Sequence, residues 1–264
     1  MSKGVRNEMG LTGVGALSVE DVRTVNVSRE RFYAFLSRLF AKEVDEEALN
    51  TIVTAQPTIH SLASSQEAEE LKDGSRLLQD FIGQAGVLKG KEKQDWITDL
   101  RAEYAALFLA VGMPYKGKER LLTCESAYLG KHHTYYDRPF FLVKDAYKRS
   151  GFEKRKDYLE PEDHIAVELD YMANLCKQSQ LSLEENNLED TSRYLNLQKD
   201  FLRDHLLKWV PDLCKSLKET ADSKLYKSLA YLTNGFISME GEVVDELAET
   251  LQPFISEKAD HTRS

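Results

Sequence analysis

The stretch ITDLRAEYAALFLAV, residues 97–111, decides the fold class of this chain. Its apolar residues recur every three or four positions, at Ile97, Leu100, Tyr104, Leu107, Phe108 and Val111. This spacing places one apolar stripe along an α-helix and does not fit the two-residue alternation of a strand. Gly112 and Pro114 follow directly and predict the end of the helix.

The same spacing recurs through most of the chain, and no segment shows strand alternation. The first stripe begins after Ser28, which is expected to cap its helix, and the last helix is expected over residues 223–251. One further helix is expected to stop near Pro57, and another is expected to cover residues 66–83. A short helix is expected to start at about Cys124, and the next is expected to run from Pro139 to Gly151. Two more are expected, one that begins at Pro161 and one that reaches Trp209, with Pro211 starting the next segment.

The sequence therefore predicts an all-α protein, with a single helical domain of about ten helices and a hinge near the middle. Residues 1–25 are rich in glycine and small residues and are expected to form a flexible leader. The remaining expected parts are a helical domain over 26–255, divided into an N-terminal part 26–150, a hinge 148–160 and a C-terminal part 161–255, and a flexible tail over 256–264.

Composition narrows the function classes. The formal net charge of −9 argues against a nucleic-acid partner, which needs a basic surface, but allows a basic peptide. The three cysteines form no Cys-x-x-Cys pair, so a zinc ribbon or redox motif is not expected. No apolar run is long enough to span a membrane, no secretory signal is visible and no glycine loop suits a nucleotide phosphate. We therefore expect a cytoplasmic protein that is not an enzyme.

The densest polar stretch is EPEDH, residues 160–164. Pro161 is expected at the first position of a helix, with acidic residues favourable beside the positive end of the helix dipole, and this needs no function. The alternative is a polar rim beside an apolar groove, since paired carboxylates bind the forked donors of a guanidinium. His164, Glu168 and Tyr171 would share one face of that helix.

A second hypothesis is a metal-dependent all-α hydrolase that uses Asp163, His164 and Glu168, with His132 or His133. The density of ligand-type residues is its only support. The order Asp163-His164 is the reverse of the His-Asp pair expected in such enzymes, and no Glu-x-x-His pair is repeated.

Two other segments have both structural and functional interpretations. The stripe at Tyr104, Leu107 and Phe108 is typical of a helical core, although its two alanines would let another helix approach closely. The basic stretch over residues 144–156 is typical of a solvated hinge, and its alternative is an anion site for a phosphorylated cofactor, with Lys154, Arg155 and Lys156 as the contacts.

Three short motifs, in this order along the chain, resemble those of the TorD/DmsD/NarJ family of redox-enzyme maturation chaperones, in its TorD/DmsD branch. The first is an aromatic-x-x-Leu-Phe segment at Tyr104, Leu107 and Phe108. The second is a Glu-Ser-x-Tyr segment at Glu125, Ser126 and Tyr128. The third is a Glu-Pro-x-Asp-His segment at Glu160, Pro161, Asp163 and His164. The resemblance covers roughly residues 28–252.

The resemblance implies an all-helical cytoplasmic chaperone. Such a protein binds the twin-arginine signal peptide of a molybdenum-containing oxidoreductase until the molybdopterin cofactor and partner subunits are in place. It implies that Asp163 and His164 recognise the signal peptide and that the first motif forms the apolar wall. The other expected peptide-binding residues are Glu125, Ser126, Tyr128, Glu160, Pro161 and Glu168.

No cofactor is expected to be bound permanently, and the basic residues Lys154, Arg155 and Lys156 are expected at most to contact molybdopterin cofactor or a nucleotide transiently. The oligomeric state is left open between a monomer and a dimer, including a domain-swapped dimer.

Overall fold

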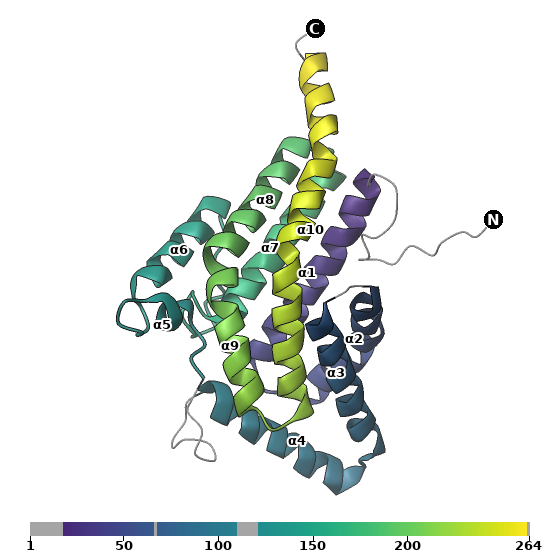
Figure 1. The fold of residues 1–264 in the computed structure, drawn as a ribbon, viewed down its shortest axis with the longest axis vertical. Coiled ribbons are helices and arrows are strands. Elements are labelled where there is room, and N and C mark those ends of the chain that lie inside the picture. Colours follow the sequence, from purple (N-terminus) through teal and green to yellow (C-terminus); the bar gives the residue numbers. More distant parts are fainter. Residues whose placement is uncertain (1–17, 66–67, 110–120, 263–264) are drawn as a thin grey trace, which may run out of the picture.

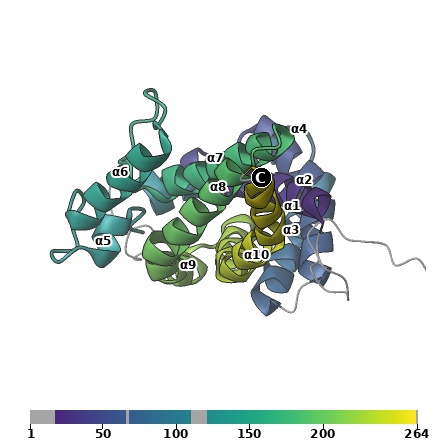
Figure 2. The same ribbon diagram turned by 90° about the horizontal axis from the view of Figure 1, so that it is seen from above.

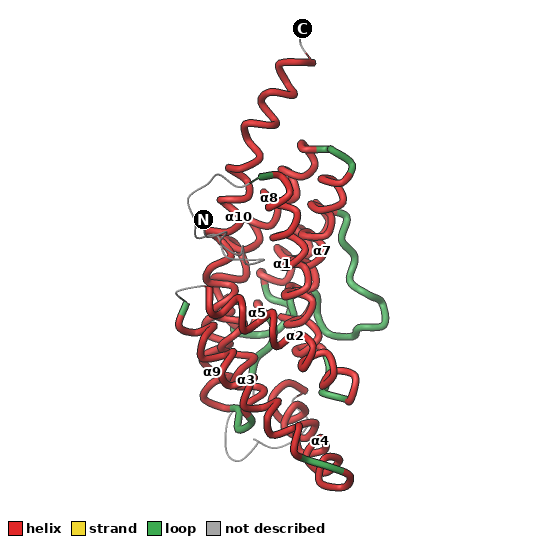
Figure 3. Tube along the Cα trace, turned by 90° about the vertical axis from the view of Figure 1, so that its right-hand side faces the viewer, coloured by secondary structure: helices red, strands yellow, loops and turns green. Residues whose placement is uncertain are grey.

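The computed structural model describes residues 18–65, 68–109 and 121–262. These residues form helices joined by loops and contain no strand (Figure 3), which confirms the all-α prediction. Within them, no helix is both long and apolar enough to cross a membrane. The predicted helix end at Gly112 and Pro114, and most of the predicted leader, lie outside the described residues.

The helices are named in chain order. They are α1 (Val19–Ala41), α2 (Glu46–Ser65), α3 (Glu69–Val87), α4 (Gly90–Tyr104), α5 (Glu125–Leu129), α6 (Arg138–Ser150), α7 (Ile165–Glu184), α8 (Leu188–Phe201), α9 (Leu207–Thr220) and α10 (Lys224–Thr262), with two π-helical segments, η1 (Ala105–Leu109) and η2 (Leu202–Leu206).

The long helix α10 is central to the bundle and packs against α3, α8, α9 and α1, while α7 packs between α1 and α8. Figure 1 shows α4 crossing one end of this bundle, and the C-terminal end of α10 projecting beyond the other helices at the opposite end. The shorter helices α5 and α6 lie at one edge of the molecule, beside α8 and α9 (Figure 2). The helix α5 carries the second motif, Glu125, Ser126 and Tyr128, which is described below.

Glycine permits the close packing of α3 against α10. A Cβ atom added at Gly74 would lie 2.8 Å from a side-chain carbon of Leu232, and one added at Gly235 would lie 2.9 Å from the backbone of Leu71. Both distances are far below van der Waals contact, so any larger residue would push the two helices apart.

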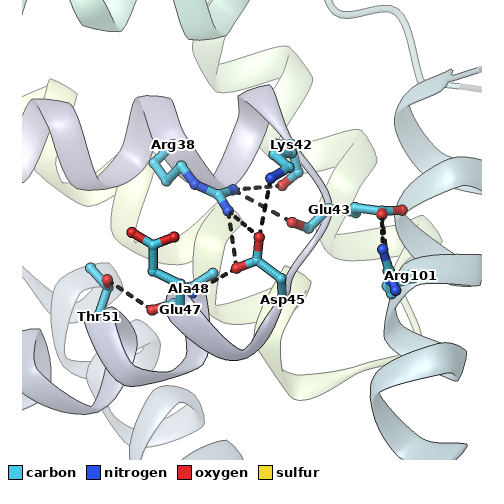
Figure 4. Close-up of polar contacts among 8 residues, drawn as sticks. All are labelled: Arg38, Lys42, Glu43, Asp45, Glu47, Ala48, Thr51 and Arg101. Atoms are coloured by element: carbon cyan, nitrogen blue, oxygen red, sulfur yellow. Dashed lines mark hydrogen bonds and ion pairs between the residues drawn. The ribbon is translucent and has the colours of Figure 1, made fainter. Parts of the chain in front are cut away.

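Charged residues fix the turn between α1 and α2 (Figure 4). Asp45 accepts a hydrogen bond of 2.8 Å from the backbone N–H of Ala48 and so caps the start of α2. Arg38 reaches from α1 to the same carboxylate, and Arg101 of α4 pairs with Glu43. The turn is thereby tied to helices on both sides.

The first helix begins earlier than expected. Its N-cap is Ser18, which exchanges hydrogen bonds with Asp21 in a capping box, so the prediction of an N-cap at Ser28 is wrong. Residues 19–25, which the sequence assigns to the leader, are helical, and Val22 and Val25 contribute to the core. At the other end, α10 continues to Thr262, into the residues expected to form the tail.

Two prolines lie inside helices, although each was expected to break one. Pro57 is inside α2 and Pro211 is inside α9. Both are exposed, and the residues four positions earlier, Val53 and Leu207, are exposed too. The backbone carbonyl that each proline leaves without a helical donor therefore faces water, which lowers the cost of the missing hydrogen bond. By contrast, Gly151 ends α6 as expected, with a positive φ of 72°.

An ion pair in the interior joins the first and last helices. Arg29 of α1 and Glu240 of α10 are 0% and 1% exposed and lie 2.7 Å apart. Arg29 also donates to Asn26 and Gln198, and Tyr33 donates to Glu240. Burial acts to lower the pKa of the Arg29 guanidinium, but its neighbours Cys176 and then Glu240 raise it above its usual value, so Arg29 stays charged. The network satisfies charges that would otherwise be very costly to bury.

We predict that Arg29→Met lowers the free energy of unfolding by about 3–5 kcal/mol, because it leaves the Glu240 carboxylate buried without its cation. The double variant Arg29→Met/Glu240→Gln should recover most of that loss, since no buried charge remains. Urea denaturation of the three proteins measures both effects.

The control is Arg23→Met, which removes the exposed ion pair between Arg23 and Glu184. It should change the free energy of unfolding by no more than about 0.5 kcal/mol. Similar losses for Arg23→Met and Arg29→Met would contradict a special role for the buried pair.

Candidate functional site

The second and third motifs meet through a short backbone pairing. Cys124 and His164 form an antiparallel bridge. The N–H of Glu125 donates to the carbonyl of Asp163 at 2.9 Å, and the N–H of Ile165 donates to the carbonyl of Thr123 at 2.8 Å. This pairing places the start of α5 against the start of α7, although the two segments are almost 40 residues apart in the chain.

The pairing also explains why Pro161 is not at the first position of a helix, as the sequence predicts. Because the backbone groups of Asp163 and Ile165 pair with those of Glu125 and Thr123, His164 between them is extended, and α7 begins only at Ile165. Pro161 lies in the turn before this segment and is half-buried.

Asp163 caps α5 instead of lying in the first turn of α7. Its Oδ2 accepts a hydrogen bond of 2.8 Å from the backbone N–H of Ser126. The side chain is 0% exposed, and burial raises the pKa of this carboxyl although the contacts with Ser126 act in the opposite direction. Asp163 therefore links the two motifs a second time.

His164 is the N-cap of α7. Its Nδ1 accepts a hydrogen bond of 3.2 Å from the N–H of Ala166, and the hydroxyl of Tyr158 lies 3.3 Å from the same nitrogen. Burial, and then the charge of Lys154, lower the pKa of His164 to about 3. The imidazole is therefore neutral at physiological pH and acts here as a hydrogen-bonding group.

Two further carboxyl groups lie beside Asp163. Glu125 Oε2 is 2.8 Å from Nδ1 of His205, and Glu168 Oε2 accepts a hydrogen bond of 3.1 Å from Nε1 of Trp209. Glu125 and Glu168 are 1% and 0% exposed. We call Glu125, Asp163 and Glu168 the acidic cluster.

Burial is the main reason that the pKa of each carboxyl in the acidic cluster is raised. For Glu168 the neighbouring charges of Glu125 and Asp163 raise the pKa further, and the shift is large. Three carboxylates cannot all be charged at close range in a medium of low polarity. The environment of Glu168 therefore favours its neutral form, and the charge of the cluster depends on its surroundings.

An open pocket of about 420 Å³ adjoins the third motif. Lys144, Lys154, Tyr158 and Glu162 are among the residues that line it, and Glu162 pairs with Lys144 at 3.3 Å. Glu160, which is half-buried, lies two residues before Glu162. The pocket thus gives solvent access to the loop that leads into the acidic cluster.

The first motif lies in the core next to this loop. Tyr104, Leu107 and Phe108 are 3%, 1% and 7% exposed, and the hydroxyl of Tyr104 donates to the carbonyl of Phe40 at 2.9 Å. Burial, and after it the charge of Glu160, raise the pKa of Tyr104. These side chains face the protein interior, and their contact with a peptide stays a prediction.

The remaining predicted residues are more accessible. Tyr128 is half-buried and packs on Trp209, with ring centroids 5.3 Å apart. In the basic run, Lys154 donates to the carbonyl of Glu160, and Arg155 pairs with Asp157. Lys156 is exposed.

Two members of the site, His205 and Trp209, were not included in the expected peptide-binding set. They lie one helical turn apart, across the junction of η2 and α9, which is a periodicity that core residues also have. Their polar contacts with Glu125 and Glu168 span 80 and 41 positions of the chain. Nothing in the local sequence could show these pairings.

The metal-dependent hydrolase finds no support in this geometry. Across residues 18–65, 68–109 and 121–262, no group of three His, Cys, Asp or Glu side chains is arranged to hold a metal ion. His164 Nδ1 and Asp163 Oδ2 already accept hydrogen bonds from backbone N–H groups. The three cysteines are buried free thiols, as expected.

Comparison with known proteins agrees with the family resemblance of the three motifs. The family model described as "Nitrate reductase delta subunit" matches residues 64–215. Chaperone protein TorD of Vibrio parahaemolyticus is 28% identical over 223 residues, which cover 84% of this chain and 97% of that protein. The TorD of Photobacterium profundum is 28% identical over 215 residues, covering 81% and 93% of the two chains.

The fold and these matches define a helical protein of the chaperone class. The chain belongs to the nitrate reductase delta subunit family. The family resemblance carried by the three motifs is thereby confirmed.

We predict that Glu168→Gln stabilises the protein more at pH 8 than at pH 5. Because the folded-state pKa of Glu168 is raised, the wild-type protein loses stability as pH rises from the unfolded pKa, about 4.3, towards the folded value. Glutamine keeps an acceptor for Trp209 and has no proton to lose. The gain at pH 8 should be about 1 kcal/mol or more, an increase in Tm of roughly 2–4 °C.

The control Glu242→Gln changes an exposed carboxylate on α10 and should give the same small difference at both pH values. Calorimetric melting curves at pH 5 and pH 8 measure the effect. A Tm difference between Glu168→Gln and wild type that stays constant with pH would show that Glu168 is charged in the folded protein.

Proposed function

We propose that this chain binds the twin-arginine signal peptide of a molybdenum-containing oxidoreductase and holds that enzyme during cofactor insertion, before export. The chain is a redox-enzyme maturation chaperone, as its family and its relatives named chaperones indicate. The observation that carries the peptide part of the proposal is the acidic cluster, because it gathers three carboxyl groups at the inner end of an accessible loop.

The chemistry of the cluster suits a guanidinium. Each carboxyl group in the cluster is buried, so ionising it there is costly, as the raised pKa values indicate. An arginine that entered would supply the missing positive charge and up to five N–H donors. Oxygens with no hydrogen-bond partner, on Asp163 and Glu168, remain available to accept them.

Access requires a movement of the chain. Asp163 and Glu168 are 0% exposed, so the basic head of a peptide must first meet accessible carboxylates outside the cluster, such as Glu162 in the lining of the pocket and the half-buried Glu160. We infer that the loop over residues 151–162 then shifts to admit the arginine. This segment is a favourable place for such a shift, because most of its side chains are exposed or half-buried.

We predict that replacing both arginines of a client leader peptide with alanine weakens binding at least tenfold, about 1.4 kcal/mol. Asp163→Asn should weaken binding of the unchanged peptide by a similar factor or more, since it removes a charge but keeps the oxygen that caps α5. Glu189→Gln, an exposed change on α8, is the matched control. Titration calorimetry provides the dissociation constants.

Equal affinity of the two peptides would contradict the arginine proposal. If Asp163→Asn lowered the Tm strongly while binding of the folded fraction was unchanged, Asp163 would serve only as a cap.

We further predict that the affinity for the signal peptide increases from pH 5 to pH 8. The carboxyl groups of the cluster have raised pKa values in the free protein and must lose protons to pair with arginine. His164 does not contribute, because its pKa of about 3 keeps it neutral throughout this range. Calorimetry in buffers of different ionisation enthalpy should detect protons released on binding, and proton uptake would contradict the prediction.

Several finer parts of the function rest on the family alone. The cytoplasmic location, the absence of catalytic activity and the choice between monomer and domain-swapped dimer stay predictions. A transient contact with molybdopterin cofactor or a nucleotide through Lys154, Arg155 and Lys156 is also a prediction. The ion pair of Arg155 with Asp157 leaves Lys156 as the most available of the three.

A further inference from the structure

A second open groove lies on the other side of α6, separate from the pocket beside the third motif. It has a volume of about 570 Å³ and is lined by α6 on one side and by η2 and α9 on the other. Lys148 of α6 borders both hollows, so α6 forms the ridge between them. The expected peptide-binding residues do not line this second groove.

The groove has a buried histidine in its lining. His205 is 4% exposed, and its ring is stacked on Phe201 with centroids 4.6 Å apart. Its Nδ1 is held by the carboxylate of Glu125 at 2.8 Å, which fixes the orientation of the ring. Since Glu125 is buried and does not line the groove, the small exposed part of the imidazole is on the opposite side.

The second ring nitrogen of His205, Nε2, forms no hydrogen bond with any other residue of the described ranges. It is not among the fully buried polar atoms that lack a partner, so it is within reach of the groove. Burial raises the pKa of the Glu125 carboxyl, and when this carboxyl keeps its proton it donates to Nδ1, which places the ring proton on Nε2 and makes Nε2–H a donor aimed at the groove.

Positive charge predominates around this nitrogen. Lys148, Arg149 and Lys208 line the groove, together with Asp145, which pairs with Lys148 at 3.3 Å, and Asp204, which lies 4.0 Å from Lys208. Asp204 is already neutralised from outside the groove by Arg203, which binds both of its oxygens at 3.0 and 2.7 Å. A local excess of cations remains, in a chain whose formal net charge is −9.

The stability of α6 accounts for part of the positive charge in the groove, but it does not account for the position of His205. Lys148 and Arg149 are in the last turn of α6, where cations are favourable at the negative end of the helix dipole. His205 belongs to another element and is held by a buried carboxylate. Its accessible nitrogen is therefore the feature that indicates a ligand.

We propose that this groove is a carboxylate-binding site, in which Nε2–H of His205 donates to one oxygen of the ligand while Arg149 and Lys208 neutralise its charge. A carboxylate fits better than a phosphate dianion, because Asp145 remains on the rim and would repel a second negative charge. The carboxylate comes either from an acidic side chain of a bound polypeptide or from a small free dicarboxylic acid. The site does not depend on signal-peptide binding.

The test follows the six histidine ring signals of the full chain by NMR, with the His205 signal assigned from His205→Gln. Three probes are titrated at constant ionic strength: sodium succinate, the capped peptide acetyl-Gly-Glu-Gly-amide and inorganic phosphate. We expect a saturable shift of the His205 signal with succinate or with the peptide. Tighter binding of the peptide would identify a polypeptide side chain as the source, and tighter binding of succinate would identify a small acid.

His205→Gln leaves Glu125 without its partner and can lower stability, so two surface variants carry the main comparison. Arg149→Glu/Lys208→Glu should weaken carboxylate binding at least tenfold. Lys156→Glu, in the other pocket, should leave it unchanged. The proposal is overturned if sodium chloride gives the same His205 shift, if both variants behave alike, or if phosphate binds more tightly than either carboxylate.

Discussion

The buried ion pair between Arg29 and Glu240 is the interaction on which the rest of the fold depends. It joins the first and last helices of the chain and, through Gln198, reaches α8 as well. A charged pair of this kind contributes little net stability compared with apolar packing, but it tolerates only one relative position of the helices, because any slip would leave a charge unsatisfied. The apolar stripes provide most of the favourable burial, and the pair selects one arrangement among those that the stripes permit.

The acidic cluster contrasts with the ion pair between Arg29 and Glu240. Its carboxyl groups are as buried as Glu240, but no arginine among residues 18–65, 68–109 and 121–262 pairs with them, and burial raises their pKa values. A site of this kind favours the neutral form of its carboxyl groups when it is empty and can pair with a cationic group that enters it. Asp163 and His164 meanwhile cap two helices, so the residues that the family assigns to recognition also support the local fold.

The sequence predicted features that depend on residues close together in the chain, and it did not predict features that depend on contacts between distant segments. Helix periodicity and Gly151 were enough to predict the fold class and the end of α6. Pro57 and Pro211 misled the prediction of helix ends, because their effect depends on whether the affected carbonyl faces water. The motifs located part of the site. The pairing of Glu125 with His205 is a tertiary contact, and no pattern in the surrounding residues reports it.

The π-helical segment η2 has a consequence for how this edge of the molecule can vary. A π turn accommodates one residue more than an α turn, so deleting a single residue within Leu202–Leu206 would restore a regular α-helix. Every side chain beyond the deletion would then rotate by about 100° about the helix axis. Trp209 would turn away from Glu168 while α8 kept its place. The extra residue in this turn therefore sets the rotation of α9 relative to α8, so that each of these two parts of one continuous helix faces its own neighbours.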